Sequence, residues 1–164
     1  LFVKEGFSLP KSLMLVSISA LGFILGSFLA VRISDRFERK WTAAVVALIW
    51  TFALLLIGFF PQPVTVMICG FIASATISTL VPLLYTYTAE NFPTSFRTTG
   101  VSITDGLGHL GGAFCGQIIL AAYMLFHPIG FGFQAAFGTM ALSGLITAVL
   151  LFFGNKMTRK GLSQ

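Results

Sequence analysis

The sequence has unusually few charged residues. Only 9% of its 164 residues are Asp, Glu, Lys or Arg, whereas 56% are hydrophobic. Soluble globular domains carry about 25% charged residues, so this chain cannot cover a compact fold with a water-soluble surface. The shortage of charge therefore excludes an ordinary soluble domain.

The uncharged runs are long enough to cross a bilayer. Four of them, 12–31, 41–60, 64–89 and 128–155, contain no charged residue, and a fifth run carries one formal charge, Asp105. About 20 helical residues span the roughly 30 Å of a bilayer's hydrocarbon core. We predict an all-α fold, a polytopic membrane helix bundle with five transmembrane helices at about 12–33, 41–60, 64–89, 98–126 and 132–154.

The two ends lie outside this predicted bundle, which as a whole covers 12–155. Residues 1–11 are expected to form an external loop that follows a truncated helix, and residues 156–164 a cytoplasmic tail. The first apolar run is too long for the core of a signal peptide. Because the chain begins with Leu1 and has an odd number of predicted helices, we expect a C-terminal piece of a longer protein.

Cysteines and catalytic motifs are scarce. Cys69 and Cys115 both fall inside apolar runs, where packing is a better explanation than a disulfide or a metal site. The sequence contains neither H-E-x-x-H nor G-x-S-x-G, which disfavours an intramembrane enzyme. We therefore expect no metal, no cofactor and no enzymatic activity.

The few basic residues are unevenly distributed between the two sides of the predicted bundle. Only Lys4 and Lys11 lie on one side, and the net charge of +5 is better explained by topology than by nucleic-acid binding. Basic loops face the cytoplasm, so we predict a multi-pass protein of the plasma (inner) membrane with a cytoplasmic C-terminus. The other side holds eight basic residues: Arg32, Arg36, Arg39, Lys40, Arg97, Lys156, Arg159 and Lys160.

Small and polar residues distinguish the helices. The second and fifth are apolar nearly all round and are expected to face lipid, whereas Gly22 and Gly26 give the first a close-packing face. In the third helix, Pro82 is expected to cause a kink. The same helix carries a stripe of small and polar residues that includes Ser74, Ser78 and Tyr85.

The fourth predicted helix gathers its polar and small residues on one face. That face must look into the bundle or a cavity, because a carboxylate turned toward lipid would cost at least about 2.5 kcal/mol. The glycines at four-residue spacing predict close helix packing. The face consists of Ser102, Asp105, Gly108, His109, Gly112 and Gly116.

Asp105 and His109 are four residues apart, so their side chains can meet and share a proton. The alternative is structural: Asp105 would anchor the basic cluster or cap its helix, and His109 would bond to a neighbouring helix. We keep both interpretations. The candidate proton or substrate pathway comprises Ser74, Ser78, Tyr85, Asp105, His109 and Gln117.

Two charged connectors resemble those of a known family. The segment SDRFERK resembles the D-R-x-G-R-[KR] signature of the major facilitator superfamily, and YTAENFPTSFRTTG resembles the E-x-x-P-x-x-x-R-x-x-G connector of its sugar-porter and metabolite symporter branch. The resemblance covers essentially the whole chain. It implies the C-terminal half of a major facilitator fold, from the end of helix seven through helix twelve.

The resemblance also implies a cytoplasmic gating network in which several charges act as a latch. Glu38 and Lys40 are expected to be solvated connector residues instead, and Glu38 replaces a Gly of the signature. The network residues that match the family's motifs are Asp35, Arg36, Arg39, Glu90 and Arg97.

The implied function is secondary active transport of a small metabolite by alternating access, coupled to protons. Its expected partners are the lipid bilayer, the substrate, protons and the missing N-terminal half. The third predicted helix lacks the Trp and Asn usual in sugar porters, which favours an organic acid or a nicotinate-like compound over a hexose, and His109 stands where many relatives have Arg. The alternative is a truncated or non-transporting membrane protein that oligomerises through its glycine-rich faces.

Overall fold

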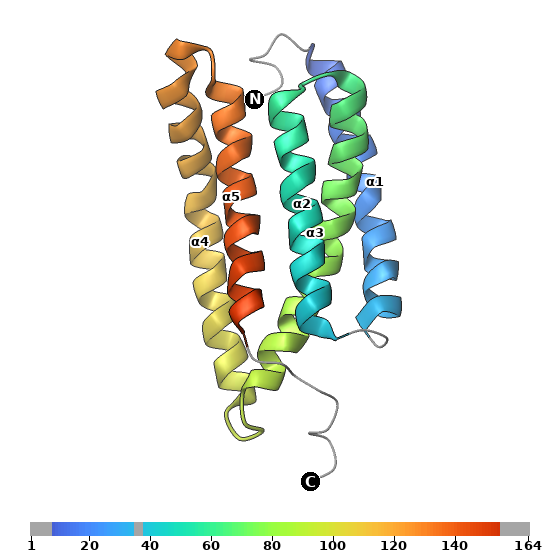
Figure 1. Ribbon diagram of the computed structural model, residues 1–164, viewed down its shortest axis with the longest axis vertical. Helices are drawn as coiled ribbons and strands as arrows, with labels where there is room; N and C mark the ends of the chain where they lie inside the picture. The colour runs from blue at the N-terminus through green and yellow to red at the C-terminus, as the bar shows by residue number, and fades with distance from the viewer. Residues whose placement is uncertain (1–7, 35–37, 155–164) are drawn as a thin grey trace.

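The computed structural model describes residues 8–34 and 38–154. Within those ranges the fold is all-α, as predicted, and its five α-helices are each long and apolar enough to cross a membrane (Figure 1). The elements are α1 (Leu9–Ser34), α2 (Arg39–Phe59), α3 (Pro63–Asn91), α4 (Arg97–Phe126), the 3-10 turn η1 (His127–Ile129) and α5 (Gly132–Phe153).

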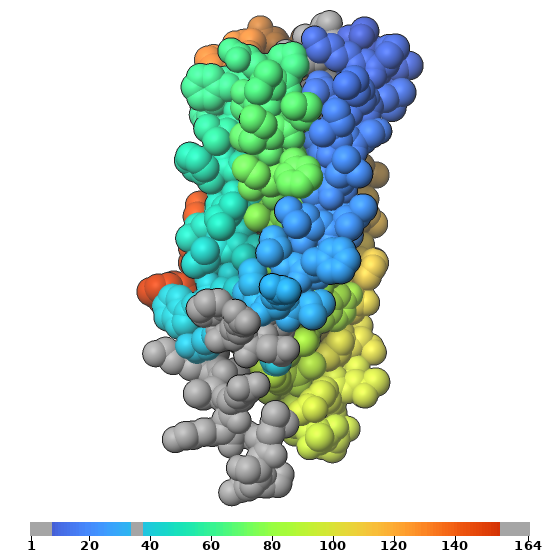
Figure 2. All heavy atoms as spheres, turned by 90° about the vertical axis from the view of Figure 1, so that its right-hand side faces the viewer, coloured from blue at the N-terminus to red at the C-terminus, as the bar shows by residue number. Residues whose placement is uncertain are grey.

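The helices run alternately up and down, and their order in space differs from their order in the chain (Figure 1). The α1 helix packs against α3, α2 lies between α3 and α5, and α5 also contacts α4. The face seen in Figure 2 is covered mainly by α1, with α3 and α2 beside it. At the opposite edge of the bundle, α4 is the least buried of the five described spans.

Small residues let α1 and α3 approach each other closely. A Cβ atom at Gly22 would overlap the carbonyl oxygen of Phe71, and one at Gly26 would overlap that of Ala75. The Thr79 hydroxyl donates to the carbonyl of Gly26 at 2.9 Å, which ties the two backbones together. Close approach and buried hydroxyl bonds substitute for the hydrophobic effect, which cannot drive helices together in lipid.

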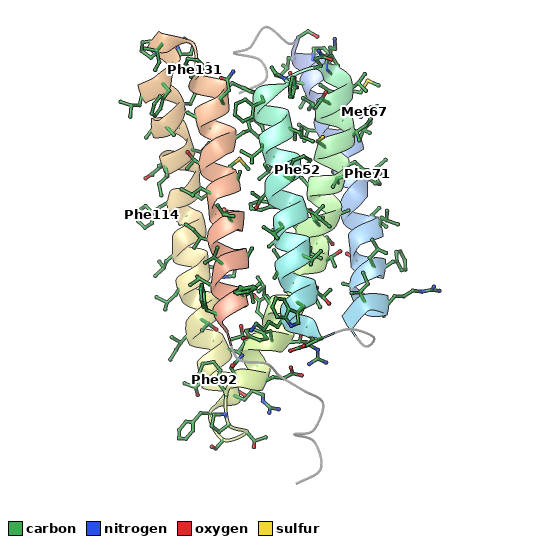
Figure 3. The ribbon with its side chains drawn as sticks, in the orientation of Figure 1. Phe52, Met67, Phe71, Phe92, Phe114 and Phe131 are labelled. Carbon is green, nitrogen blue, oxygen red and sulfur yellow. The ribbon has the colours of Figure 1, made fainter. Side chains whose placement is uncertain are left out.

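The α2 and α5 helices each have a buried and an exposed face. Ala43, Ala47 and Ala136 are completely buried, and they help α2 and α5 pack against each other and against α3. The remaining surface of α2 exposes apolar side chains such as Phe52 (Figure 3). Only the exposed face of each of these two helices is therefore available for the expected contact with lipid. The other face of α2 packs against α3 and α5.

Lys40 does not behave as the solvated connector residue that the sequence predicted. It lies in the first turn of α2, is only 5% exposed, and its Nζ atom donates to the carbonyl of Gly154 at 2.5 Å. Gly154 caps the C-terminus of α5, where unpaired carbonyls carry partial negative charge. Lys40 is buried because α2 already begins at Arg39, which places Lys40 on the inward face of the first helical turn. An oxygen of Glu38 is buried as well.

The α3 helix changes direction in its lower part, beyond Pro82 (Figure 1). Proline lacks an amide hydrogen and its ring collides with the preceding turn, so a helix bends there. Before the bend, Ser78 donates a hydrogen bond of 2.8 Å to the carbonyl of Phe23 in α1. After the bend, α3 approaches α4, which places Tyr85 against the fourth helix.

Candidate functional site

An open groove of about 670 Å³ lies between the lower part of α3 and the first half of α4. The connector that joins the two helices is short, and the ring of Phe92 (labelled in Figure 3) lies against Gly100 at the start of α4. The groove is lined by Val81, Leu84, Tyr85 and Thr88 from α3 and by Thr104, Asp105, Gly108, His109, Gly112 and Ala113 from α4.

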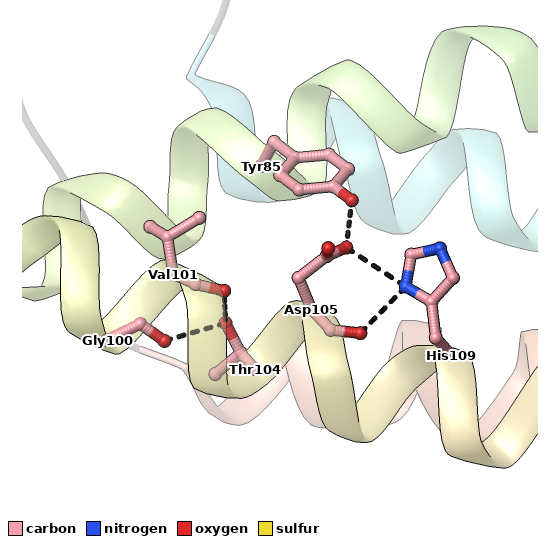
Figure 4. Close-up of polar contacts among 6 residues, drawn as sticks. All are labelled: Tyr85, Gly100, Val101, Thr104, Asp105 and His109. Atoms are coloured by element: carbon pink, nitrogen blue, oxygen red, sulfur yellow. Dashed lines mark hydrogen bonds and ion pairs between the residues drawn. The ribbon is translucent and has the colours of Figure 1, made fainter.

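Three polar side chains meet in this groove (Figure 4). The Tyr85 hydroxyl donates to the Oδ1 atom of Asp105. The Nδ1 atom of His109 lies 2.9 Å from the backbone carbonyl oxygen of Asp105 and 3.4 Å from its Oδ1 atom. An acid, an imidazole and a phenol from two helices therefore form one connected group.

This group is only partly covered by the described residues. The side chain of His109 is 77% exposed and that of Asp105 is 37% exposed. Thr104 is less available for ligand binding, because its hydroxyl donates to the carbonyls of Gly100 and Val101 within its own helix. Asp105 carries the one formal charge among the residues that line the groove, with aliphatic side chains forming its walls.

The predicted pathway residues separate into two groups. Tyr85, Asp105 and His109 come together as described. Ser74 does not line the groove, and Ser78 is buried between α1 and α3, 2.8 Å from the hydroxyl of Ser27. Gln117 is exposed on α4 beyond the groove.

Among the described residues, no helix packs against the α4 glycines whose spacing predicts close helix packing, so that packing stays a prediction. A Cβ atom at Gly108, Gly112 or Gly116 would meet nothing within 4 Å among the described residues. Gly108 and Gly112 instead form part of the groove lining. Periodicity correctly placed these residues on one face of a helix, but it could not show what that face meets.

Sequence reasoning missed two polar residues of the groove, Thr88 and Thr104. Thr88 follows Tyr85 by three residues, and Thr104 precedes Asp105 directly. Residues three apart lie on the same face of a helix, so searching one turn beyond Tyr85 would have found Thr88.

A second group of charges lies where α2 begins and α3 ends. Arg39 forms an ion pair with Glu90, and both side chains are partly exposed. Arg97, the first residue of α4, makes no ion pair with any residue in the described ranges. Asp35 and Arg36, the other predicted members of the network, lie outside the described residues.

Within 8–34 and 38–154, no group of three or more His, Cys, Asp or Glu side chains could hold a metal ion. Cys69 is buried and Cys115 is exposed on α4, and neither forms a disulfide. The chemistry that these residues can provide is proton binding, hydrogen bonding and charge pairing.

Comparisons with known proteins give a consistent result. The chain matches the Major Facilitator Superfamily over residues 2–163. It is 30% identical over 161 residues to "Putative metabolite transport protein YyaJ" of Bacillus subtilis (strain 168), covering 98% of this chain and 35% of that protein. It is 28% identical to "Niacin transporter NiaP" of Acinetobacter baylyi over 100% of this chain and 37% of the relative.

A third relative is "Benzoate transport protein" of Acinetobacter baylyi, 27% identical over 92% of this chain and 32% of that protein. The chain thus spans about a third of the length of these curated relatives. No solved structure matches it. Because the family match extends over nearly the whole chain, this chain belongs to the major facilitator superfamily.

Proposed function

We propose that this chain is part of a proton-coupled secondary active transporter for a small organic metabolite, and that the groove between α3 and α4 forms part of its substrate pathway. The observation that carries the proposal is the group formed by Tyr85, Asp105 and His109. Ionisable side chains are costly within membrane spans and commonly mark substrate or proton pathways. The remainder of the pathway would come from a further half of the transporter, since binding sites in this superfamily lie between repeats.

The proposed substrate is a small carboxylate rather than a hexose. Two relatives are named for niacin and benzoate, which are small aromatic acids. The groove offers aliphatic walls from Val81, Leu84 and Ala113 together with a polar group at Asp105 and His109, which suits a compact ligand with an apolar body and one polar group.

The ion pair between Arg39 and Glu90 is proposed as part of a cytoplasmic latch that breaks and re-forms as the transporter alternates between states. It joins the start of α2 to the end of α3, the helix that also supplies Tyr85. Partly exposed pairs contribute little individually, about 0–1 kcal/mol, which makes such a contact easy to open.

A second candidate function is a non-transporting protein that oligomerises through α4. It is favoured by the open face at Gly108, Gly112 and Gly116, because small residues at this spacing also suit a neighbouring helix. Measurable substrate transport by the full-length protein in liposomes would exclude this candidate.

The Asp105→Asn variant tests the transport proposal. In the full-length protein, we expect it to abolish accumulation of niacin or benzoate driven by a proton gradient and to leave substrate exchange largely intact, because exchange needs no net proton movement. Ser143→Ala is the matched control, since Ser143 is an exposed polar residue of α5 outside the groove. The proposed role of Asp105 in proton coupling would be contradicted if Asp105→Asn still accumulated substrate against a gradient. It would also be contradicted if this variant lost exchange and accumulation equally.

A further inference from the structure

The orientation of His109 decides which of its ring nitrogens can exchange a proton. Its Nδ1 atom lies 2.9 Å from the backbone carbonyl oxygen of Asp105. A carbonyl oxygen only accepts hydrogen bonds, so Nδ1 must carry a hydrogen in either charge state of the ring. The proton that makes the ring an imidazolium is therefore gained and lost at Nε2.

The Nε2 atom is available to a ligand. His109 lines the groove, its side chain is 77% exposed, and both of its polar contacts within the described residues involve Nδ1. When the ring is neutral, Nε2 can only accept a hydrogen bond. When the ring is protonated, Nε2 donates one and carries positive charge, which is what a carboxylate requires.

The groups facing this ring are few. Asp105 lies on the same helix with its Oδ1 atom 3.4 Å from Nδ1, and Tyr85 of α3 donates to that carboxylate. The α5 helix, which also packs against α4, has no titratable side chain anywhere along Gly132–Phe153. The formal charge of the groove is therefore −1 with a neutral ring and 0 with an imidazolium.

We propose that the protonated Nε2 atom of His109 binds the carboxylate of the substrate, so that one proton enters with each monocarboxylate. This inference rests on the transport function proposed above. A carboxylate that entered beside Asp105 and a neutral ring would bring two negative charges together at short range and make the formal charge of the groove −2. With the proton, the charge returns to −1, the value of the empty groove. After the substrate leaves on the inner side, Nε2 releases its proton to water.

The three side chains then have different roles. His109 contacts the substrate and carries the proton. Asp105 is a positioning residue, and its charge prevents the substrate carboxylate from binding without a proton. Tyr85 holds the Asp105 side chain in place through its hydrogen bond. The same reasoning explains why Asp105→Asn should keep exchange and lose coupling: the amide that replaces the Asp105 carboxylate removes the repelling charge and can donate a hydrogen bond to the anion, which can then bind while Nε2 is unprotonated.

The test measures binding of benzoate and of its neutral analogue benzamide to the purified full-length protein at about pH 6, 7 and 8. For the unmodified protein, benzoate affinity should fall by about tenfold per pH unit at the upper end of this range, because one proton binds with each anion. His109→Gln should weaken benzoate binding at pH 6 by at least about tenfold and leave weak benzamide binding unchanged. His109→Arg should bind benzoate with little pH dependence, exchange it, and fail to accumulate it.

Ser143→Ala should retain the full pH profile, because Ser143 bonds within α5 and lies outside the groove. A His109→Gln protein with the original pH profile, or a His109→Arg protein that keeps it, would overturn the His109 assignment while leaving the transport function in place. Uptake of a quaternary ammonium probe in place of benzoate would overturn the carboxylate class alone. A full-length protein that transports neither kind of probe would overturn the transport function itself.

Discussion

At the residue scale, two adjacent cations at the start of α2 have different environments. Arg39 is partly exposed and pairs with Glu90, whereas Lys40 is buried and bonds to the last carbonyl described in the chain, at Gly154. Exposed ion pairs contribute about 0–1 kcal/mol, whereas hydrogen bonds from a charged group contribute about 1.5–3 kcal/mol. Lys40 therefore holds the ends of α2 and α5 together, and Arg39 makes the contact that can open.

We predict that Arg39→Gln and Glu90→Gln each slow substrate uptake by the full-length protein by roughly two- to fivefold, in line with the energy of a partly exposed pair. The double variant should be no slower than the slower single variant, because the second change removes a partner that is already lost. Initial uptake rates at equal expression measure this. Multiplicative effects of the two changes would show that the residues act independently.

At the element scale, contact between α1 and α3 depends on the absence of side chains. Gly26 lies against the backbone of Ala75, and the buried hydroxyl of Thr79 bonds across the same contact. Backbone atoms cannot move aside as a flexible side chain can, so any added atom must separate the helices.

Gly26→Ala should destabilise the protein by about 1–3 kcal/mol, because its methyl group would overlap the α3 backbone. Gly138→Ala is the matched control, since a Cβ atom there meets nothing within 4 Å among the described residues. Thermal unfolding of both variants in detergent measures the difference. Equal melting temperatures for the two variants would contradict the packing argument.

The sequence predicted the helices better than the site, for physical reasons. Uncharged runs must match the thickness of the bilayer, so the five spans were recognisable by length alone. Ser78 and Tyr85 were predicted on one stripe because periodicity assumes a straight helix. The bend at Pro82 separates them, leaving Ser78 against α1 and Tyr85 against α4. Asp105 and His109 were easier to pair, because both lie on one uninterrupted helix.

At the scale of the whole molecule, the alternating helices place successive connectors at opposite ends of the bundle (Figure 1). The connector before α2 is basic, whereas the turn between α2 and α3 contains Gln62 and no charge. Basic segments tend to remain in the cytoplasm during insertion, so the charge distribution predicts an orientation for the bundle.

We predict that a cysteine at Gln62 is labelled by a membrane-impermeant thiol reagent in intact cells, whereas one at Glu38 is labelled only after the cells are permeabilised. Each cysteine is introduced into a background in which Cys69 and Cys115 are replaced by Ala. The reverse pattern, labelling of Glu38→Cys but not Gln62→Cys in intact cells, would invert the topology.

The position of α5 between α2 and α4 has a consequence for how the protein is made. A ribosome delivers helices to the membrane in chain order, so α4 arrives before the helix that covers most of its contact surface. The other described helix that α4 contacts in the folded structure is α3, which precedes it in the chain and supplies Tyr85 as a partner for Asp105. The acid of α4 therefore takes its polar partner from a helix that is inserted earlier, and it does not depend on α5 for that partner.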